Sequence, residues 1–182
     1  STAILAPKNQ EDSLTSKLSN YSAIANFSGI SIPNDKSNLS NEAIERIKSF
    51  EFFSKHFVPY INFEDLVASK KWDIKSNNII YDRKIYNSKN KQWTRAEKFR
   101  KKSKPSNQEA YELYKDILEI KEDKETLFVE VSITHVSPYI SKEWTELIIN
   151  KINEIMRLND IEESKNSIEF LNNSLSNTNV QS

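Results

Sequence analysis

Residues 127–144 read LFVEVSITHVSPYISKEW and combine a strand pattern with a helix start. Leu127 to His135 alternates apolar and polar residues, which predicts a strand with one buried face. Ser137-Pro138 follows directly and is typical of a helix start, with serine as the N-cap and proline at the first helical position. A half-buried strand that leads at once into a helix therefore forms the centre of the predicted domain.

The helix that begins here contains nothing in its sequence to end it. No glycine or proline occurs from Tyr139 to Ser182, so it would extend on the order of 60 Å. Its first part carries a stripe suited to a protein core, made of Trp144, Ile148, Ile152 and Ile155. Its second part carries a seven-residue apolar seam beside Phe170, made of Ile161, Ile168, Leu171 and Leu175.

The seam lies too far along the helix for a small body to cover it. We therefore expect a partner outside the preceding residues, either a returning helix from further along the chain or another subunit. The alternative is that the end of the helix, after Asn172, frays.

The residues before this stretch predict a small α+β body. The expected elements are strands over 1–6 and 78–86 (one or two short ones) and helices over 11–27, 40–58, 62–68 and 106–118. Ser106 and Glu109 form a capping box at the start of the last of these helices, and a charged turn over 121–124 follows it. The predicted fold is a small mixed sheet flanked by helices, with a base over 1–140 and a projecting helix over 141–182.

The composition excludes several classes of function. The chain has no cysteine, so it has no disulfide, thiolate metal site or cysteine nucleophile. Gly29 is its single glycine, whereas loops that cradle nucleotide phosphates need several. Its 26 basic and 26 acidic residues give no net charge, which argues against nucleic acid as the main partner. We expect no cofactor, no metal and no catalytic constellation.

A basic connector over 98–104 is the one candidate binding segment outside the long helix. Its candidate residues for contact with an anionic group are Lys98, Arg100, Lys101 and Lys102, with Lys104 beside them. The anionic group could belong to a lipid headgroup, a lipid-linked glycan or a nucleic acid. A solvated connector is the alternative reading.

The remaining side chains with possible chemistry favour structural roles. His56 and His135 stand far apart and lack ligand spacing to each other, so we expect both to pack in the fold. Glu119-Ile120-Lys121 matches the E-x-K of metal-dependent nucleases, but the pattern predicts a helix end there, so an enzyme of that kind is a remote alternative. The three tryptophans could stack on sugars, although burial in the core is the commoner role; they are Trp72, Trp93 and Trp144.

Several short motifs, taken in order, carry a resemblance to a known family. They are Ser1-Thr2-Ala3, Trp72-Asp73, Tyr81-Asp82, Trp93 with Arg95, Pro105-Ser106 through Glu109-Ala110-Tyr111, Ile133-Thr134-His135-Val136-Ser137-Pro138-Tyr139, Lys142-Glu143-Trp144 and Ile152-Asn153. In this order they resemble the polysaccharide co-polymerases, the Wzz-type chain-length determinants of lipopolysaccharide O-antigen. The stretch from Pro105 to Leu175 is the most specific.

The resemblance implies a non-enzymatic function. Family members are inner-membrane proteins with two membrane helices and a periplasmic α+β domain that projects a helical hairpin, and they form closed homo-oligomers. They set the number of repeat units that a separate membrane polymerase adds to a lipid-linked glycan. By this resemblance the chain is a piece of such a periplasmic domain, with the O-antigen polymerase and the lipid-linked glycan as partners. A capsule or exopolysaccharide co-polymerase coupled to a kinase is the related alternative.

Overall fold

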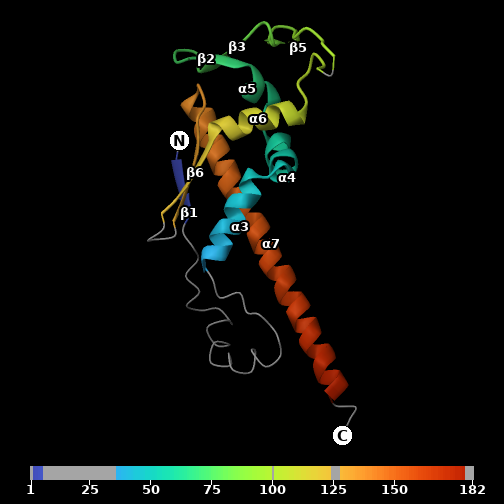
Figure 1. The fold of residues 1–182 in the computed structure, drawn as a ribbon. Helices are drawn as coiled ribbons and strands as arrows, with labels where there is room; N and C mark the ends of the chain where they lie inside the picture. The colour runs from blue at the N-terminus through green and yellow to red at the C-terminus, as the bar shows by residue number, and fades with distance from the viewer. Residues whose placement is uncertain (1, 6–35, 100, 124–127, 179–182) are drawn as a thin grey trace.

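The computed structural model describes residues 2–5, 36–99, 101–123 and 128–178, and the side chains among them except those of 36–38 and 175–178. The helix predicted over 11–27 lies outside these residues. Figure 1 shows a body of short strands and helices from which one long helix projects. The fold is α+β, as the sequence predicts.

A three-stranded sheet forms one layer of the body. β1 (Thr2–Leu5) and β6 (Leu118–Glu122) flank β7 (Val129–Ile133), so the strand order is β1-β7-β6. The buried side chains of the central strand alternate as predicted and are Val129, Val131 and Ile133. All described strand pairs are antiparallel, whereas the sequence favoured a mixed sheet. The short connection from β6 to β7 leaves no room for a parallel crossover.

β6 corrects the prediction for the residues after the capping-box helix. The sequence predicts a helix through Leu118 and a charged turn over 121–124, but α6 (Asn107–Ile117) stops one residue earlier and a strand follows. Pairing with β7 holds these residues in a strand. Leu118 and Ile120 lie on the same face of that strand and pack against the core. The Glu119-Ile120-Lys121 motif therefore lies on an edge strand and not at a helix end.

α7 (Pro138–Thr178) is the long helix, and Ser137 caps its first turn. The amide of Ile140 donates to Ser137 Oγ at 3.4 Å, and Pro138 occupies the first helical position, as predicted. Ser141 Oγ donates to the carbonyl of Ile133 at 2.6 Å. This hydrogen bond joins the first turn of the helix to the end of β7.

One side of α7 is buried against the body over its first half. Trp144, Ile148 and Ile152 are at most 2% exposed, and Ile155 packs at the edge of the same core. This is the predicted stripe. Burial of each such side chain contributes roughly 1.5–3 kcal/mol, so the stripe holds the helix firmly on the body.

The helix predicted from Ser40 to Pro59 is divided into shorter pieces. They are α3 (Lys36–Lys48), α4 (Phe50–Phe52), the π-helix η2 (Phe53–Phe57) and the 3-10 helix η3 (Val58–Tyr60). Ser49 causes the first break, because its backbone is extended. Its Oγ donates to the carbonyl of Arg46 at 2.7 Å and accepts from the amide of Phe52 at 3.1 Å, so it competes with the helical hydrogen bonds. Helix α3 also begins before Ser40, so that serine is not its N-cap.

The π-helix directs two phenylalanines into the core. Phe53 and Phe57 are fully buried, and their rings lie 5.1 and 5.0 Å from the ring of Tyr114 on α6. Phe57 also meets Trp144 of α7 edge-on at 5.5 Å. The hydroxyl of Tyr114 donates to the carbonyl of Ile47 at 3.0 Å. These contacts join α3, α6 and α7 around one aromatic cluster.

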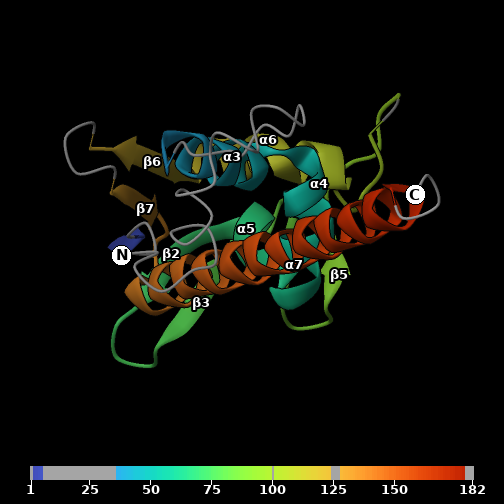
Figure 2. The same ribbon diagram turned by 90° about the horizontal axis from the view of Figure 1, so that it is seen from below.

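Two short hairpins complete the body at the end where α7 begins (Figure 1), and the view from below in Figure 2 shows α7 running across the body with α3 and α6 to one side of it. α5 (Phe63–Ala68), which confirms the predicted helical turn, leads into the pair β2 (Ser69–Asp73) and β3 (Asn78–Tyr81). The second pair is β4 (Tyr86–Asn87) and β5 (Gln92–Trp93). The strand residues predicted over 78–86 thus belong to different hairpins. Among the described residues, no helix has the length and apolar content to cross a bilayer.

Matched substitutions on α7 test how the helix is held. Ile148→Ala removes a fully buried side chain and should lower the free energy of unfolding by about 2–5 kcal/mol, because it leaves a cavity. Ile168→Ala, at a side chain that is 59% exposed, should change it by less than about 0.5 kcal/mol. Urea unfolding followed by circular dichroism measures both. Equal losses would show that the first half of α7 is not its anchor.

Candidate functional site

The second half of α7 carries an exposed apolar face. Every residue from Ile161 to Ser174 is exposed, and Figure 1 shows this part of the helix running clear of the body. We call the following four residues the distal face: Leu158 (53% exposed), Ile161 (43%), Ile168 (59%) and Leu171 (50%). Phe170 is also exposed, but by the helical period it lies on the opposite side of α7 from Ile161 and Ile168. Leu175 belongs to the helix, but its side chain lies outside the described residues.

The distal face is suited to pairing with another helix. α7 is continuous to Thr178 and does not turn back to cover its own apolar residues. The seven-residue spacing of Ile161 and Ile168 keeps them on one side of a left-handed helix pair. Burial of each half-exposed side chain would contribute about 1 kcal/mol.

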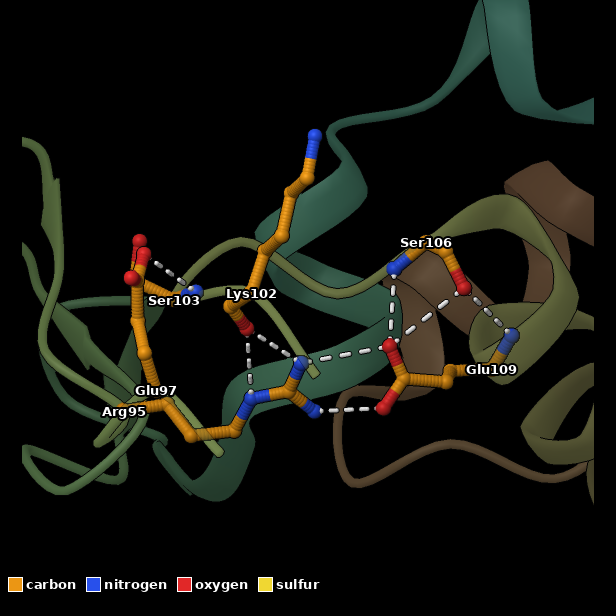
Figure 3. A network of polar contacts seen from close by, with 6 residues as sticks. All are labelled: Arg95, Glu97, Lys102, Ser103, Ser106 and Glu109. Atoms are coloured by element: carbon orange, nitrogen blue, oxygen red, sulfur yellow. Dashed lines mark hydrogen bonds and ion pairs between the residues drawn. The ribbon is translucent and has the colours of Figure 1, made fainter. Parts of the chain in front are cut away.

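A bidentate ion pair holds the basic connector against the start of α6, as Figure 3 shows. Arg95 Nη1 and Nη2 donate to Glu109 Oε1 and Oε2 at 2.7 and 3.2 Å, and Nη2 and Nε of the same arginine donate to the carbonyl of Lys102 at 2.6 and 3.2 Å. Glu109 Oε2 also accepts from the amide of Ser106 at 3.0 Å, while Ser106 Oγ accepts from the amide of Glu109 at 3.2 Å. The predicted capping box is therefore present. We call this arrangement the Arg95 clamp.

The clamp positions the predicted anion-binding residues at the surface. Lys98 and Lys101 exchange two backbone hydrogen bonds of 3.0 and 2.9 Å, which close a tight turn. The side chains of Lys98, Lys101 and Lys102 are exposed on this turn. Lys104 lies over the ring of Phe63 at 5.4 Å. Arg100 lies outside the described residues.

The clamp also changes the ionisation of its carboxylate. The hydrogen bond from Arg95, followed by that from the Ser106 amide, lowers the pKa of Glu109 from 4.5 to about 2. The same hydrogen bond from Arg95 raises the pKa of the guanidinium. Both side chains are partly buried, so the pair is less screened by water than an ordinary surface ion pair.

His135 has a structural role, as expected. The amide of Ser137 donates to Nδ1 at 3.1 Å, so Nε2 carries the proton and donates to the carbonyl of Asp65 at 3.1 Å. The imidazole ring packs 5.0 Å from the ring of Trp144. Both ring nitrogens are thus engaged by backbone groups, and the histidine connects α5 to the start of α7.

Asp65 is a buried carboxylate that the sequence analysis did not single out. It accepts from the hydroxyl of Tyr81 at 2.6 Å and from Asn62 Nδ2 at 3.1 Å. Burial, together with this hydrogen bond to Asp65, raises the pKa of Tyr81. The contacts join α5 to β3. No local sequence signal marks this role, because the partner tyrosine lies sixteen residues away.

The other candidate side chains are not brought together. His56 and Glu51 both line a surface pocket of about 330 Å³, and the Glu51 carboxylate pairs with Lys55 at 2.7 Å. Glu119 pairs with Lys121 of its own strand at 2.9 Å. Within the described part of the chain, no three histidine or acidic side chains form a group that could hold a metal ion.

The tryptophans pack against other rings. Trp144 is buried beside Phe57, and Trp93 lies 4.9 Å from the ring of Tyr86. Trp72 meets Tyr139 edge-on at 5.9 Å. These contacts favour packing over the predicted alternative of sugar stacking.

Comparisons with known proteins found no relative: no family model, curated protein or solved structure matches this chain. The function therefore has to be inferred from the residues and their geometry.

The clamp predicts a loss of stability in acid. The pKa of Glu109 is lower in the folded than in the unfolded state, so its stabilisation is present above about pH 4.5 and is lost as the pH falls toward about 2. Glu109→Gln should lower the free energy of unfolding at neutral pH by about 1–2 kcal/mol and flatten its pH dependence between these values. Urea unfolding at stepped pH measures this.

The control is Glu112→Gln, which removes an exposed carboxylate from the same helix, where it pairs with Lys115. This variant should keep the acid dependence of the unmodified chain. If Glu109→Gln kept it too, the clamp would have no role in acid stability.

Proposed function

We propose that this chain is part of a non-catalytic scaffold that regulates the length of a bacterial polysaccharide, in the manner of the Wzz-type determinants that its motifs resemble. In this proposal the body lies in the periplasm beside the inner membrane. Copies of the protein associate through their projecting helices and act on the O-antigen polymerase and its lipid-linked glycan. The observation that carries the proposal is the exposed distal face on a helix that is rigidly attached to the body.

The anchoring of α7 supports a scaffold function because it fixes the direction in which the helix projects from the body. The buried stripe and the Ser141 hydrogen bond hold the first half of the helix, and an uninterrupted helix transmits that orientation to the second half. The distal face therefore presents the same geometry in each copy. Identical head-to-tail contacts between such copies close into a ring when the rotation between neighbours allows it.

The roles of the polar side chains also support a scaffold over an enzyme. Both ring nitrogens of His135 contact backbone groups, Asp65 holds Tyr81, and Glu109 is neutralised by Arg95. Groups that could serve in acid–base chemistry are thus used to fix the body. Polysaccharide length would then follow from the geometry of the assembly.

Gel analysis of lipopolysaccharide tests the proposal in cells. In a strain that lacks the gene, the full gene should restore a modal band of O-antigen lengths. A variant with Ile168→Asp and Leu171→Asp should give an unregulated ladder, because two carboxylates cannot be buried in a helix seam without a large desolvation cost. Immunoblotting checks that both proteins are made in equal amounts.

The matched control places the same charges on the other side of the helix. The control variant carries Asn166→Asp and Asn173→Asp. Both asparagines are exposed, and the helical period places them on the side of α7 away from the distal face. This variant should keep the modal band. An unregulated ladder with the unmodified gene would refute the proposed function, and a modal band with the Ile168→Asp, Leu171→Asp variant would refute the role of the distal face.

A further inference from the structure

Charge is distributed unevenly along this neutral chain. Residues 69–104 contain thirteen basic and three acidic side chains, a formal charge of +10, so the other residues together carry −10. Ten of the thirteen cations are lysines. This segment comprises the two hairpins β2-β3 and β4-β5 and the basic connector. The positively charged region therefore extends well beyond the connector.

The fold gathers this segment at one end of the molecule. Figure 1 shows β2, β3, β5 and the connector together at the end where α7 begins, opposite to the C-terminal end of that helix. Eleven of the thirteen basic side chains are exposed there. We call the exposed surface of residues 69–99 and 101–104 the cationic end.

Apart from Arg95, the cations of this end that the structure describes form no ion pair within the fold. In the described part of the segment Arg95 pairs with Glu109, and none of the lysines forms an ion pair. The acids of the segment accept from nearby groups: Asp73 from Ser76 Oγ at 2.5 Å, and Glu97 from the amide of Ser103 at 3.3 Å. The positive charge is therefore available to an external anionic surface.

Exposed apolar side chains lie at the turns of the cationic end. Ile74 is 75% exposed and lies at the turn between β2 and β3. Phe99 is 89% exposed and lies in the turn that the Lys98–Lys101 hydrogen bonds close. Lys75 follows Ile74 directly. An apolar tip flanked by lysines is suited to the boundary between lipid headgroups and acyl chains, where the tip enters and the ammonium groups meet phosphate.

Ring packing and the Arg95 clamp hold the hairpins and the connector on the body. The ring of Trp93 lies 4.9 Å from Tyr86 and meets Phe63 edge-on at 5.9 Å, and Tyr81 meets Tyr86 at 5.3 Å. The Arg95 clamp fixes the connector on the other side. The cationic end is thus a preformed surface, so binding would cost little ordering of the chain.

We propose that the cationic end docks on an anionic lipid bilayer. Each basic residue beside a membrane strengthens binding to anionic lipids a few-fold, and insertion of the two apolar tips adds to this. Nucleic acid fits less well, because its recognition favours arginine forks and several stacking aromatics. The docking proposal does not depend on the regulation of polysaccharide length, and it orients α7 away from the lipid surface.

Flotation with vesicles tests this proposal on the 182-residue chain. The chain should float with vesicles of phosphatidylcholine mixed with phosphatidylglycerol and stay behind with phosphatidylcholine alone. Replacing Lys98, Lys101 and Lys102 together by Gln should weaken binding about 100-fold, because each lysine contributes a few-fold. Raising the salt from about 0.1 M to about 1 M should weaken binding of the unmodified chain by screening.

The matched control removes three lysines from outside the cationic end: Lys55→Gln, Lys115→Gln and Lys165→Gln. This control loses the same formal charge as the Lys98, Lys101 and Lys102 variant. Its affinity for anionic vesicles should stay within about twofold of that of the unmodified chain. A second variant, Ile74→Ser with Phe99→Ser, should weaken the binding that remains at high salt, since its charge is unchanged. Both turns are exposed, and unfolding midpoints equal to that of the unmodified chain check that each variant is folded.

Three results would overturn the proposal. The first is equal binding to both kinds of vesicle, and the second is equal weakening by the two lysine triples. The third is release from anionic vesicles by soluble diphosphate or by duplex DNA at concentrations that leave the vesicles intact, which would assign the cationic end to a free phosphate group or to nucleic acid. None of these outcomes bears on the O-antigen gel, so the two proposals fail separately.

Discussion

The docking of α7 on the body is the interaction on which the other features depend. Trp144, Ile148 and Ile152 insert into the core formed by the sheet, α3 and α6, and Ser141 ties the first turn to β7. Because no residue interrupts the helix, fixing its first half also fixes the direction of its second half. The apolar residues of the distal face are thereby held out of reach of the body that anchors them.

The molecule has two ends with different chemistry. One end is the exposed apolar face of α7, which suits pairing with another helix. The other is the cationic end, where exposed lysines surround the apolar tips at Ile74 and Phe99. Internal contacts position each end: the buried stripe orients α7, and the Arg95 clamp with the ring cluster around Trp93 holds the connector and the hairpins. With lipid at the cationic end, the distal face would lie farthest from the bilayer, where neighbouring copies could meet.

Local patterns in the sequence predict the elements that depend on local physics. The strand at Val129–Ile133, the start of α7 at Ser137-Pro138 and the capping box at Ser106 all follow from short-range spacing, and all are present. Local patterns predict the wrong secondary structure where pairing with a residue far along the chain determines it. The residues after Ile117 continue a helical pattern but form β6, because β7 pairs with their backbone. A strong local pattern can also hide a local competitor: residues 40–58 read as one helix, but the Ser49 hydroxyl bonds backbone groups three residues away on each side and divides it.

Periodicity within single segments is enough to predict the half-buried strand, the unbroken final helix and the two successive apolar patterns of that helix. The sequence also determined the zero net charge, but not where the charges would lie. Tertiary packing is needed to bring Arg95 to Glu109 and Tyr81 to the buried Asp65, and to place the two hairpins and the connector at one end. These pairings join residues at least fourteen positions apart, and packing of the whole body, which no short pattern records, brings them together.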